Sequence, residues 1–409
     1  MSDAIVIVGG GHAAAQLCAG LAEAGLSART HLVTAEHWLP YHRPPLSKAF
    51  LKNEAEQPQL HKPEAWYADA GIALHRGDAV VAIDRQAHTV TLASGTVLPW
   101  GRLVLATGTR ARALPGLPAG MDNVVLLRAA DEAARLRSRL ATAGRIVVVG
   151  GGFIGLEVAA TARAMGKEVT VLEAGPRLLG RAVSPALSAH VQATHEAAGI
   201  AIRLGVRDLA WTQADGRITA VEAGGEQLPL DLLLVGIGAE PETALAEAAG
   251  LACDDGTVVD DHMRTSDPDI LAVGDCTRFP ERRAGRALRL ESVQNANDQA
   301  KTAVATLAGT PRPHDALAWF WSEQGAMRLQ MAGLVPAEGT PGLETVRRQG
   351  ANAASFSLFH FVDGALVCVE SANAPMDHVM SRKLLEAGVQ PAPAAVADSA
   401  VALKTLLPV

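Results

Sequence analysis

The chain has 409 residues, of which 49% are apolar and 19% charged, so it is long and apolar enough for two or three folded domains and is not intrinsically disordered. Its 36 basic and 43 acidic side chains give a net charge of −7, which argues against a general nucleic-acid-binding protein. The four cysteines lie far apart without a CxxC or CxxxxC pair, so the sequence predicts no redox disulfide, iron–sulfur cluster or zinc site and fits a reducing cytosol.

The first predicted unit is a strand, a glycine turn and a helix. The strand is Ile5–Val8, the turn is Gly9–Gly11, and an alanine-rich helix runs from there to about Gly25. This uncharged stretch is also compatible with a membrane span, but its glycines favour the strand, turn and helix. Because the strand begins within a few residues of Met1, we expect no targeting segment and a cytoplasmic protein.

Further strands follow a stiff loop. The strand His31–Thr34 leads into a proline-rich loop, residues 40–48, whose prolines fix φ and remove hydrogen-bond donors. Later strands are expected at Val80–Ile83, Thr89–Leu92 and Arg102–Thr107.

A second strand, glycine turn and helix start at Arg145. The strand Ile146–Val149 enters the turn Gly150–Gly152, and a helix over Leu156–Met165 and a strand over Glu168–Leu172 follow. The remaining predicted elements are short strands and hairpins to Ile237, the strand Ile270–Val273, the helix Asn295–Leu307, a linker at Gly309–Pro313, the strands Arg328–Ala332, Ser355–Phe361 and Ala365–Val369, and the helix Met376–Ala387.

Both glycine turns match a dinucleotide-binding fingerprint. In the first, Gly9 and Gly11 allow a tight turn and a close approach to a pyrophosphate, and Ala14 takes the third small position. The second, with Gly150, Gly152 and Gly155, matches the full pattern. A glycine turn without a ligand is the alternative for either copy, but two copies on one chain predict that a flavin and a nicotinamide dinucleotide meet.

An acidic residue follows each fingerprint. Glu36 is expected to accept a hydrogen bond from a ribose hydroxyl. Glu173 ends a strand where a carboxylate accepts from the adenosine 2′-OH and repels a 2′-phosphate, so it predicts NADH rather than NADPH. Arg177 and Arg181 keep NADPH open, because an arginine binds a 2′-phosphate well.

Longer motifs carry a resemblance to a known family. They are RPPLSK at 43–48, GGGFIGLEVAA at 150–160, TSDP at 265–268 with VGDC at 273–276, ESVQNA at 291–296 and WFWSEQ at 319–324. With these motifs nearly the whole chain resembles the FAD-dependent pyridine nucleotide-disulfide oxidoreductases, and among them the ferredoxin reductases of bacterial oxygenase systems. The resemblance implies non-covalent FAD, NADH as donor, and single-electron transfer to a [2Fe–2S] ferredoxin that serves a Rieske dioxygenase or a cytochrome P450.

The implied fold is α/β, with two Rossmann-like dinucleotide-binding domains in the glutathione-reductase-like arrangement and a C-terminal α+β domain. The Gly274-Asp275 turn belongs by resemblance with the first fingerprint, so the nicotinamide unit is inserted into the flavin unit. The implied domains are an FAD-binding domain of residues 1–112 and 240–312, an NADH-binding domain of residues 113–239 and a C-terminal domain of residues 313–409.

The resemblance also implies cofactor contacts. Ala35 stands where many relatives have aspartate, and Glu36 is its expected replacement. Asp275, expected to contact the ribityl or pyrophosphate side, has a helix N-cap or Asx turn as its alternative. The implied FAD contacts are Gly9, Gly11, His12, Ala13, Ala35, Glu36, Arg43, Lys48, Val80, Ala106, Gly108, Arg128, Asp275, Val293 and Trp321. The implied NADH contacts are Gly150, Gly152, Phe153, Ile154, Gly155, Glu173, Arg181 and Gly238.

Lys48, Glu157 and Trp321 are the implied catalytic residues. Lys48 is expected near flavin N5 with Glu157 as its partner, where an ammonium favours the negative charge that hydride transfer creates. The alternative is a surface ion pair worth about 0–1 kcal/mol. Trp321 is expected to cover the flavin, and core packing is the alternative for the cluster Trp319–Trp321.

Two further features remain open. The basic run Arg282, Arg283, Arg286 and Arg289 is either a solvated loop or a docking surface for an acidic ferredoxin. The separation of His31, His37 and His42 predicts no metal site.

Alternative functions for a protein with this fold are those of an NADH oxidase or a rubredoxin reductase. The loop Pro45–Lys48 has no cysteine, which argues against oxidase chemistry. A flavin-binding signalling protein similar to apoptosis-inducing factor is the alternative from another class, and such proteins usually carry targeting segments or extended basic stretches.

Overall fold

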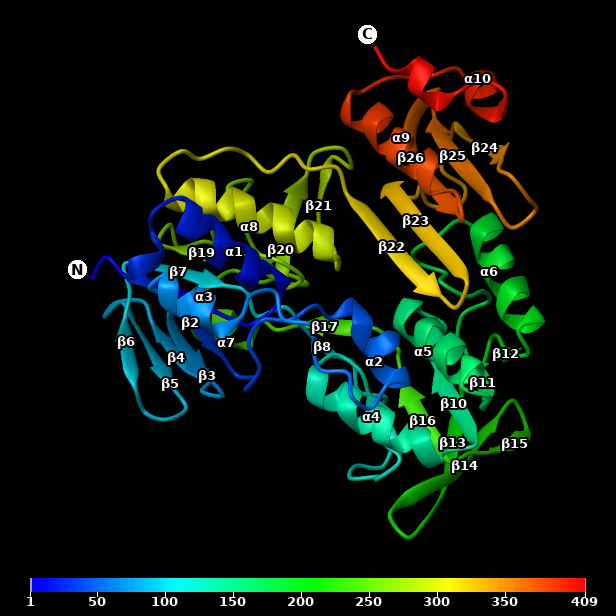
Figure 1. Ribbon diagram of the computed structural model, residues 1–409, viewed down its shortest axis with the longest axis horizontal. Helices are drawn as coiled ribbons and strands as arrows, with labels where there is room; N and C mark the ends of the chain where they lie inside the picture. Colours follow the sequence, from blue (N-terminus) through cyan, green and yellow to red (C-terminus); the bar gives the residue numbers. More distant parts are fainter. Residues whose placement is uncertain (1, 409) are drawn as a thin grey trace. The chain divides into compact units, whose positions relative to one another are not determined.

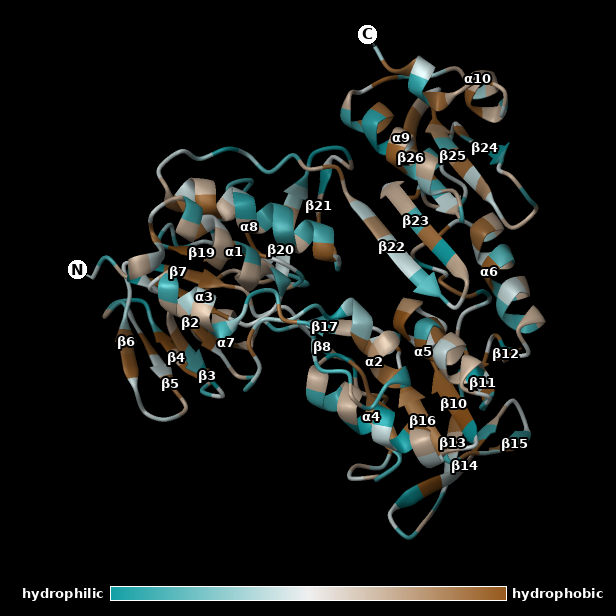
Figure 2. Ribbon diagram, in the orientation of Figure 1, coloured by the Kyte–Doolittle hydropathy of each residue, from teal (hydrophilic) through white to brown (hydrophobic). Residues whose placement is uncertain are grey.

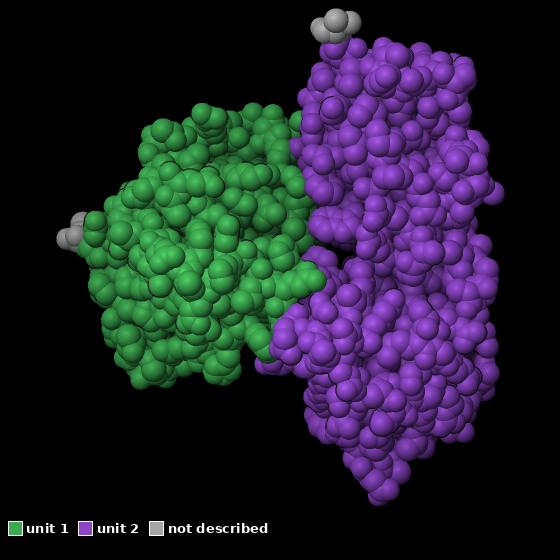
Figure 3. Space-filling view, viewed as in Figure 1, with its two compact units in different colours: residues 1–43, 58–110, 239–316 green, residues 44–57, 111–238, 317–409 purple. Residues whose placement is uncertain are grey.

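The computed structural model describes residues 2–408, which form two compact units (Figure 3). Unit 1 contains the chain up to Arg43 together with residues 58–110 and 239–316. Unit 2 contains residues 44–57 and 111–238 and the chain from Leu317 on. No helix within residues 2–408 has both the length and the hydrophobicity needed to cross a membrane.

A five-stranded parallel sheet forms the centre of unit 1. Its order is β19-β7-β1-β2-β3, with β1 (Ile5–Val8), β2 (Thr30–Thr34), β3 (Ala73–Arg76), β7 (Arg102–Leu105) and β19 (Ile270–Ala272). Every residue of β1 is buried, as expected for a strand covered on both faces. Figure 2 shows β7, one of its neighbours, in the brown of apolar residues.

Two helices of this unit pack against each other: α1 (His12–Glu23) and α8 (Val293–Leu307) (Figure 1). A Cβ at Gly20 of α1 would lie 2.9 Å from Val304 of α8, so the small residue permits this close approach. The other elements of unit 1 are η1 (Ser27–Arg29), α3 (Glu64–Asp69), the antiparallel sheet of β4 (Val80–Asp84), β5 (Thr89–Leu92) and β6 (Val97–Pro99), the pair β8 (Thr109–Ala111) and β17 (Ala239–Pro241), α7 (Ala244–Ala248), and the sheet of β18 (Thr257–Val258), β20 (Thr277–Glu281) and β21 (Arg286–Leu288).

Unit 2 contains a second parallel sheet, in the order β12-β11-β10-β16-β9. Its strands are β9 (Val124–Leu126), β10 (Arg145–Val149), β11 (Glu168–Leu172), β12 (Ala201–Arg203) and β16 (Leu232–Val235). Figure 2 shows β10 and β16 in brown, and their buried side chains share a core with an antiparallel sheet of β13 (Leu209–Ala214), β14 (Arg217–Ala223) and β15 (Glu226–Pro229). The helical segments are η2 (Pro44–Ser47), α2 (Ala49–Lys52), α4 (Ala130–Thr142), α5 (Phe153–Ala164) and α6 (Pro185–Ala197).

The C-terminal part of unit 2 is an antiparallel sheet with helices. The sheet order is β22-β23-β26-β25-β24, with β22 (Trp319–Gln324), β23 (Met327–Gly333), β24 (Leu343–Gln349), β25 (Phe356–Val362) and β26 (Ala365–Ala372). Helix α9 (Pro375–Glu386) contacts β23 and β26, and α10 (Pro393–Ala397) and η3 (Leu403–Leu406) follow. Phe359, Phe361 and Leu384 are fully buried in the core between sheet and helices.

The predicted fold class is confirmed, but the individual elements differ from the prediction in several places. Helix α5 begins at Phe153 rather than Leu156, because Gly152 has the extended backbone of an N-cap residue, so Glu157 lies in the second turn. Strands β3, β22 and β24 and helix α4 were not predicted, and the expectation of only short strands and hairpins before Ile237 is wrong, because helix α6 lies there. The N-cap alternative for Asp275 is wrong, because β20, and not a helix, follows it. The domain boundaries stay a prediction.

Asn123 links the parallel sheet of unit 2 to the neighbouring antiparallel sheet. Its fully buried amide donates to the carbonyls of Ile218 (2.7 Å) and Asp231 (3.0 Å) and accepts from the Ile218 N–H (2.9 Å). An alanine would leave these backbone groups buried without partners.

We therefore expect Asn123→Ala to lower the free energy of unfolding by about 2–3 kcal/mol. Urea denaturation followed by circular dichroism measures the change. Gln227→Ala is the matched control, since Gln227 is exposed on the same antiparallel sheet and hydrogen-bonds only at the surface. Equal midpoints for both variants would show that the Asn123 network does not stabilise the fold.

Candidate functional site: two dinucleotide turns and a buried ion pair

The first glycine turn of unit 1 is shaped for close approach. Gly9 has φ +127°, and a Cβ there would lie 2.1 Å from the carbonyl oxygen of Ala106, so only glycine fits. A Cβ at Gly11 would meet nothing within 4 Å, so the space beside this residue is open. Helix α1 starts at His12 and directs its first N–H groups to this space, which is the arrangement that binds phosphate.

Other predicted FAD contacts of unit 1 reach the same edge of the sheet. The carboxyl ends of β1, β7 and β19 align, because Val8 pairs with Leu105 and Leu105 with Ala272. Ala106 and Asp275 follow two of these ends. A Cβ at Gly274 would lie 3.3 Å from that of Ala13, so the turn containing Asp275 packs on the start of α1.

Gln299 positions this turn, and the sequence reasoning missed it. Its buried side chain on α8 accepts hydrogen bonds from the Gly274 N–H (2.7 Å) and the Thr277 hydroxyl (2.9 Å). Val293 is the first residue of the same helix, which Ser292 caps by accepting from the Asn295 N–H (3.0 Å). A single helix therefore holds both Val293 and the Asp275 turn.

The expected adenosine residues lie on neighbouring segments. Glu36 follows β2, and its carbonyl accepts from the Gly77 N–H (3.0 Å), which brings the residues before Val80 alongside. Its carboxylate accepts from the hydroxyl of Tyr41 (2.6 Å) and the guanidinium of Arg43 (2.7 Å). Each oxygen thus has one protein partner and keeps a lone pair for a ribose.

The second glycine turn, in unit 2, repeats the design of the first. A Cβ at Gly150 would lie 2.3 Å from the Gly236 carbonyl oxygen, and one at Gly155 would lie 2.3 Å from that of Gly150. At Gly152 the nearest atom would be 3.9 Å away, which leaves room for a phosphate. Ile154, on the first turn of α5, is 45% exposed.

Glu173 organises this second turn. Its two carboxylate oxygens accept from the N–H groups of Gly151 and Gly175, each at 2.6 Å. Arg181 lies near Gly238, with a guanidinium nitrogen 3.5 Å from where a Cβ would stand, whereas Arg177 donates to the Val183 carbonyl (2.8 Å). The structure therefore places Glu173 at the second turn and Arg181 beside Gly238.

Lys48 and Glu157 form an ion pair within unit 2. The Lys48 Nζ lies 2.6 Å from Glu157 Oε2 and 3.1 Å from the Pro44 carbonyl oxygen. Glu157 is only 4% exposed, which separates this pair from the weak surface pair considered above.

Two serines complete the shell around Glu157, and neither was predicted. Ser47 donates to Oε2 (2.5 Å), and Ser322 on β22 donates to Oε1 (2.7 Å). A buried chain continues from Ser322 to Gln324 (3.2 Å) and from Gln324 to His195 (2.7 Å). Burial lowers the pKa of His195, although the hydrogen bond to Gln324 raises it, so this imidazole is neutral near pH 7.

Trp321 and Arg128 also belong to unit 2. Trp321 is half-buried on β22, with its ring centroid 5.4 Å from that of Trp319. The neighbouring Phe320 packs on Phe153 at 4.6 Å, which joins the aromatic strand to the start of α5. Arg128 precedes α4, and its backbone N–H donates to Glu132 (2.6 Å).

Most of the basic run is already paired with acidic residues. Arg282 pairs with Asp261 (3.0 Å), Arg283 with Asp315 (3.3 Å), and Arg289 with both Glu291 (2.6 Å) and Asp255 (3.3 Å). Arg286 lies exposed on β21.

Cys276, which follows Asp275, is in an environment that disfavours the thiolate form. Burial raises the pKa of the Cys276 thiol, and its side chain is fully enclosed.

Comparisons with known proteins identify the family to which this chain belongs. Residues 3–300 match the family model of pyridine nucleotide-disulphide oxidoreductase, and residues 319–407 match that of the reductase C-terminal domain. The chain belongs to the pyridine nucleotide-disulphide oxidoreductases. Family membership confirms the expected oxidoreductase, and the family implies FAD and NADH as its cofactors.

Individual relatives match over nearly their whole length. Rhodocoxin reductase of Rhodococcus erythropolis is 41% identical over 98% of this chain and 93% of that protein. The crystal structure of the ferredoxin reductase for the CYP199A2 system from Rhodopseudomonas palustris has a TM-score of 0.94 at 42% identity, covering 99% of each chain. The covalent putidaredoxin reductase–putidaredoxin complex gives a TM-score of 0.93 at 38% identity, covering 99% of this chain and 98% of that one.

The geometry around Glu173 makes the predicted preference for NADH testable. Glu173→Gln removes the negative charge and turns an amide NH₂ toward one of the two backbone donors. We expect the KM for NADH to rise about 10–100-fold, as the loss of a hydrogen bond to a charged group implies, while the KM for NADPH falls.

Steady-state kinetics with both nucleotides measure this change. Glu168→Gln, an exposed substitution at the other end of β11, is the control. An unchanged ratio of the two KM values in Glu173→Gln would remove Glu173 from nucleotide selection.

Proposed function

We propose that this flavoprotein passes electrons from NADH through FAD to a [2Fe–2S] ferredoxin that supplies a Rieske dioxygenase or a cytochrome P450. The full-length similarity to a reductase solved in covalent complex with putidaredoxin is the observation that carries the ferredoxin assignment. The similarity to a reductase of a CYP199A2 system supports an oxygenase as the final acceptor. We place the reaction in the cytoplasm, consistent with four free cysteines, three of them buried.

The first glycine turn fits the pyrophosphate of FAD. Gly11 leaves open space in front of the N-terminus of α1, and a side chain there would fill the cradle. The residues proposed to hold FAD are Gly9, Gly11, His12, Ala13, Ala35, Glu36, Arg43, Lys48, Val80, Ala106, Gly108, Arg128, Asp275, Val293 and Trp321. Bound there, FAD would supply the capacity to take a hydride from NADH and to pass electrons on one at a time.

Lys48 is proposed to supply a fixed positive charge to this reaction. Four hydrogen bonds define this arrangement. The Lys48 ammonium donates to the Pro44 carbonyl and to Glu157, and the Glu157 carboxylate also accepts from Ser47 and Ser322. Because the carboxylate is nearly fully buried and hydrogen-bonded at both oxygens, the lysine has little freedom to move away. An ammonium fixed in advance stabilises developing negative charge more than a mobile surface lysine does.

The second glycine turn is proposed to bind NADH. Gly150, Gly152 and Gly155 shape the turn, and Glu173 holds the Gly151 N–H while keeping lone pairs for the adenosine ribose. The nicotinamide and flavin turns therefore use the same physical features: a strand end, a glycine turn and a helix N-terminus.

Replacement of Lys48 by Met tests its role in flavin reduction. We expect Lys48→Met to retain FAD and to slow single-turnover reduction by NADH about 100-fold, because the charge is lost while the aliphatic packing is kept. Stopped-flow absorbance at the flavin band measures the rate. Lys52→Met, four residues on and exposed, is the control, and equal rates in the two variants would exclude Lys48.

Docking of the ferredoxin is expected to depend on Arg286. Its neighbours in the basic run form ion pairs with acidic residues, so Arg286→Glu reverses a charge on this exposed surface without breaking any of those ion pairs. We expect this variant to reduce an acidic ferredoxin about 3–10-fold more slowly at low ionic strength, with the difference vanishing at high salt.

The measurement is ferredoxin-dependent cytochrome c reduction at several salt concentrations. Arg207→Glu makes the same charge change at an exposed position of unit 2 and serves as the control. Rates that do not respond to ionic strength would contradict electrostatic docking. Rapid oxygen consumption without any ferredoxin would favour the oxidase alternative.

A further inference from the structure

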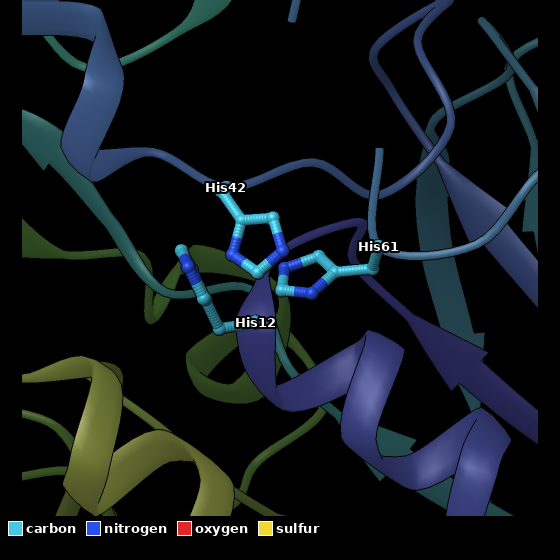
Figure 4. Close-up of side chains that lie close together, drawn as sticks. All are labelled: His12, His42 and His61. Atoms are coloured by element: carbon cyan, nitrogen blue, oxygen red, sulfur yellow. The ribbon is translucent and has the colours of Figure 1, made fainter. Parts of the chain in front are cut away.

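Three histidines from distant parts of the chain converge in unit 1 (Figure 4). His12 opens helix α1, whereas His42 and His61 come from two loop segments. Their ring centroids are 3.8 Å (His42–His61), 4.8 Å (His12–His61) and 5.8 Å (His12–His42) apart. One ring nitrogen from each residue lies within 4.8 Å of the other two.

A short antiparallel pairing explains why two of these rings meet. Tyr41 and Leu60 form an isolated β-bridge, flanked by hydrogen bonds from the His42 N–H to Gln59 (2.8 Å) and from the His61 N–H to Pro40 (2.9 Å). His42 is therefore opposite Gln59, and His61 is two residues further along the same strand. Residues two apart share a face of a strand, so both imidazoles project to one side.

We propose that His12, His42 and His61 form a binding site for a divalent transition-metal ion, with Zn²⁺ as the representative ion. Imidazole nitrogen is a preferred ligand of zinc and its neighbours in the first transition row. Three protein nitrogens leave the fourth position of a tetrahedral ion for water or another oxygen. The burial is graded from the enclosed His12 to the exposed His42, so an ion has a route from solvent.

The surrounding charges decide when an ion binds well. The Arg43 guanidinium, adjacent in sequence to His42, is neutralised by Glu36 at 2.7 Å. The N-terminus of α1 carries partial positive charge, which opposes a cation. The pyrophosphate assigned to the adjacent glycine turn would offset that charge, and the metal site rests on the proposed function in this respect and in sharing His12 with the proposed FAD contacts.

Two other clusters lack these properties. His31 and His75 face each other at 3.2 Å between their ring nitrogens, but they supply only two ligands. Asp260, Asp261 and His262 are consecutive, and the Asp261 carboxylate is already held by Arg282 and His262.

Zinc binding to the yellow, FAD-loaded protein tests the site. After chelation and dialysis, Zn²⁺ is titrated and the bound metal is measured per chain by elemental analysis, while the absorbance of the same sample reports flavin content. We expect one zinc per chain, with affinity weakened more than about 10-fold in His42→Gln and in His61→Gln. His75→Gln removes a histidine of the same unit outside the cluster and should bind zinc as the wild type does.

The outcomes separate this site from the proposed function. Yellow wild-type protein that binds no zinc, or equal losses in His75→Gln and His42→Gln, overturns the metal site and leaves the flavin assignment standing. Colourless protein that still holds one zinc through His42 and His61 supports the metal site and counts against the flavin. Unchanged melting temperatures of the variants confirm that lost binding is not lost folding.

Discussion

The burial of one carboxylate is the constraint on which unit 2 depends. An ionised carboxyl group in a protein interior is strongly unfavourable unless charges and hydrogen bonds compensate it. Glu157 on α5 obtains this compensation from the loop that carries Ser47 and Lys48 and from Ser322 on β22. Removing one partner of such a pair typically costs about 3–5 kcal/mol. The need to satisfy Glu157 thus holds together three segments that are far apart in the sequence.

Two other carboxylates show that the binding turns are organised before a ligand arrives. Glu173 fixes the N–H groups of Gly151 and Gly175, and Glu36 fixes Tyr41 and Arg43. A carboxylate accepts about four hydrogen bonds, so a ribose adds to these contacts without displacing them. A preorganised acceptor loses less entropy on binding than a mobile one does. The acidic residue after each fingerprint is therefore part of the turn as well as the proposed contact for the nucleotide.

The sequence predicted the features that are local. Continuous apolar runs predicted β1 and β10, and the glycine spacing predicted both turns, because strand burial and tight turns depend on neighbouring residues. The predicted start of α5 at Leu156 was wrong. Gly155 was counted with the turn, but it lies inside the helix, where its lack of a side chain lets it pack on Gly150. Lys48 and Glu157 were paired through family resemblance. Ser322 and Gln299 have no local pattern that marks them, since their partners are distant in the sequence.

The histidine cluster escaped prediction for the same reason, since a single β-bridge between Tyr41 and Leu60 brings His42 and His61 together. Its place beside the first fingerprint has a thermodynamic consequence. If a dinucleotide at that turn strengthens metal binding by offsetting the charge of the helix N-terminus, then the metal must strengthen dinucleotide binding by the same factor. At the second glycine turn, the side chain that contacts the turn is the carboxylate of Glu173 rather than a group of histidines. The two turns share one backbone design, yet only the first would have its cofactor affinity coupled to a metal ion.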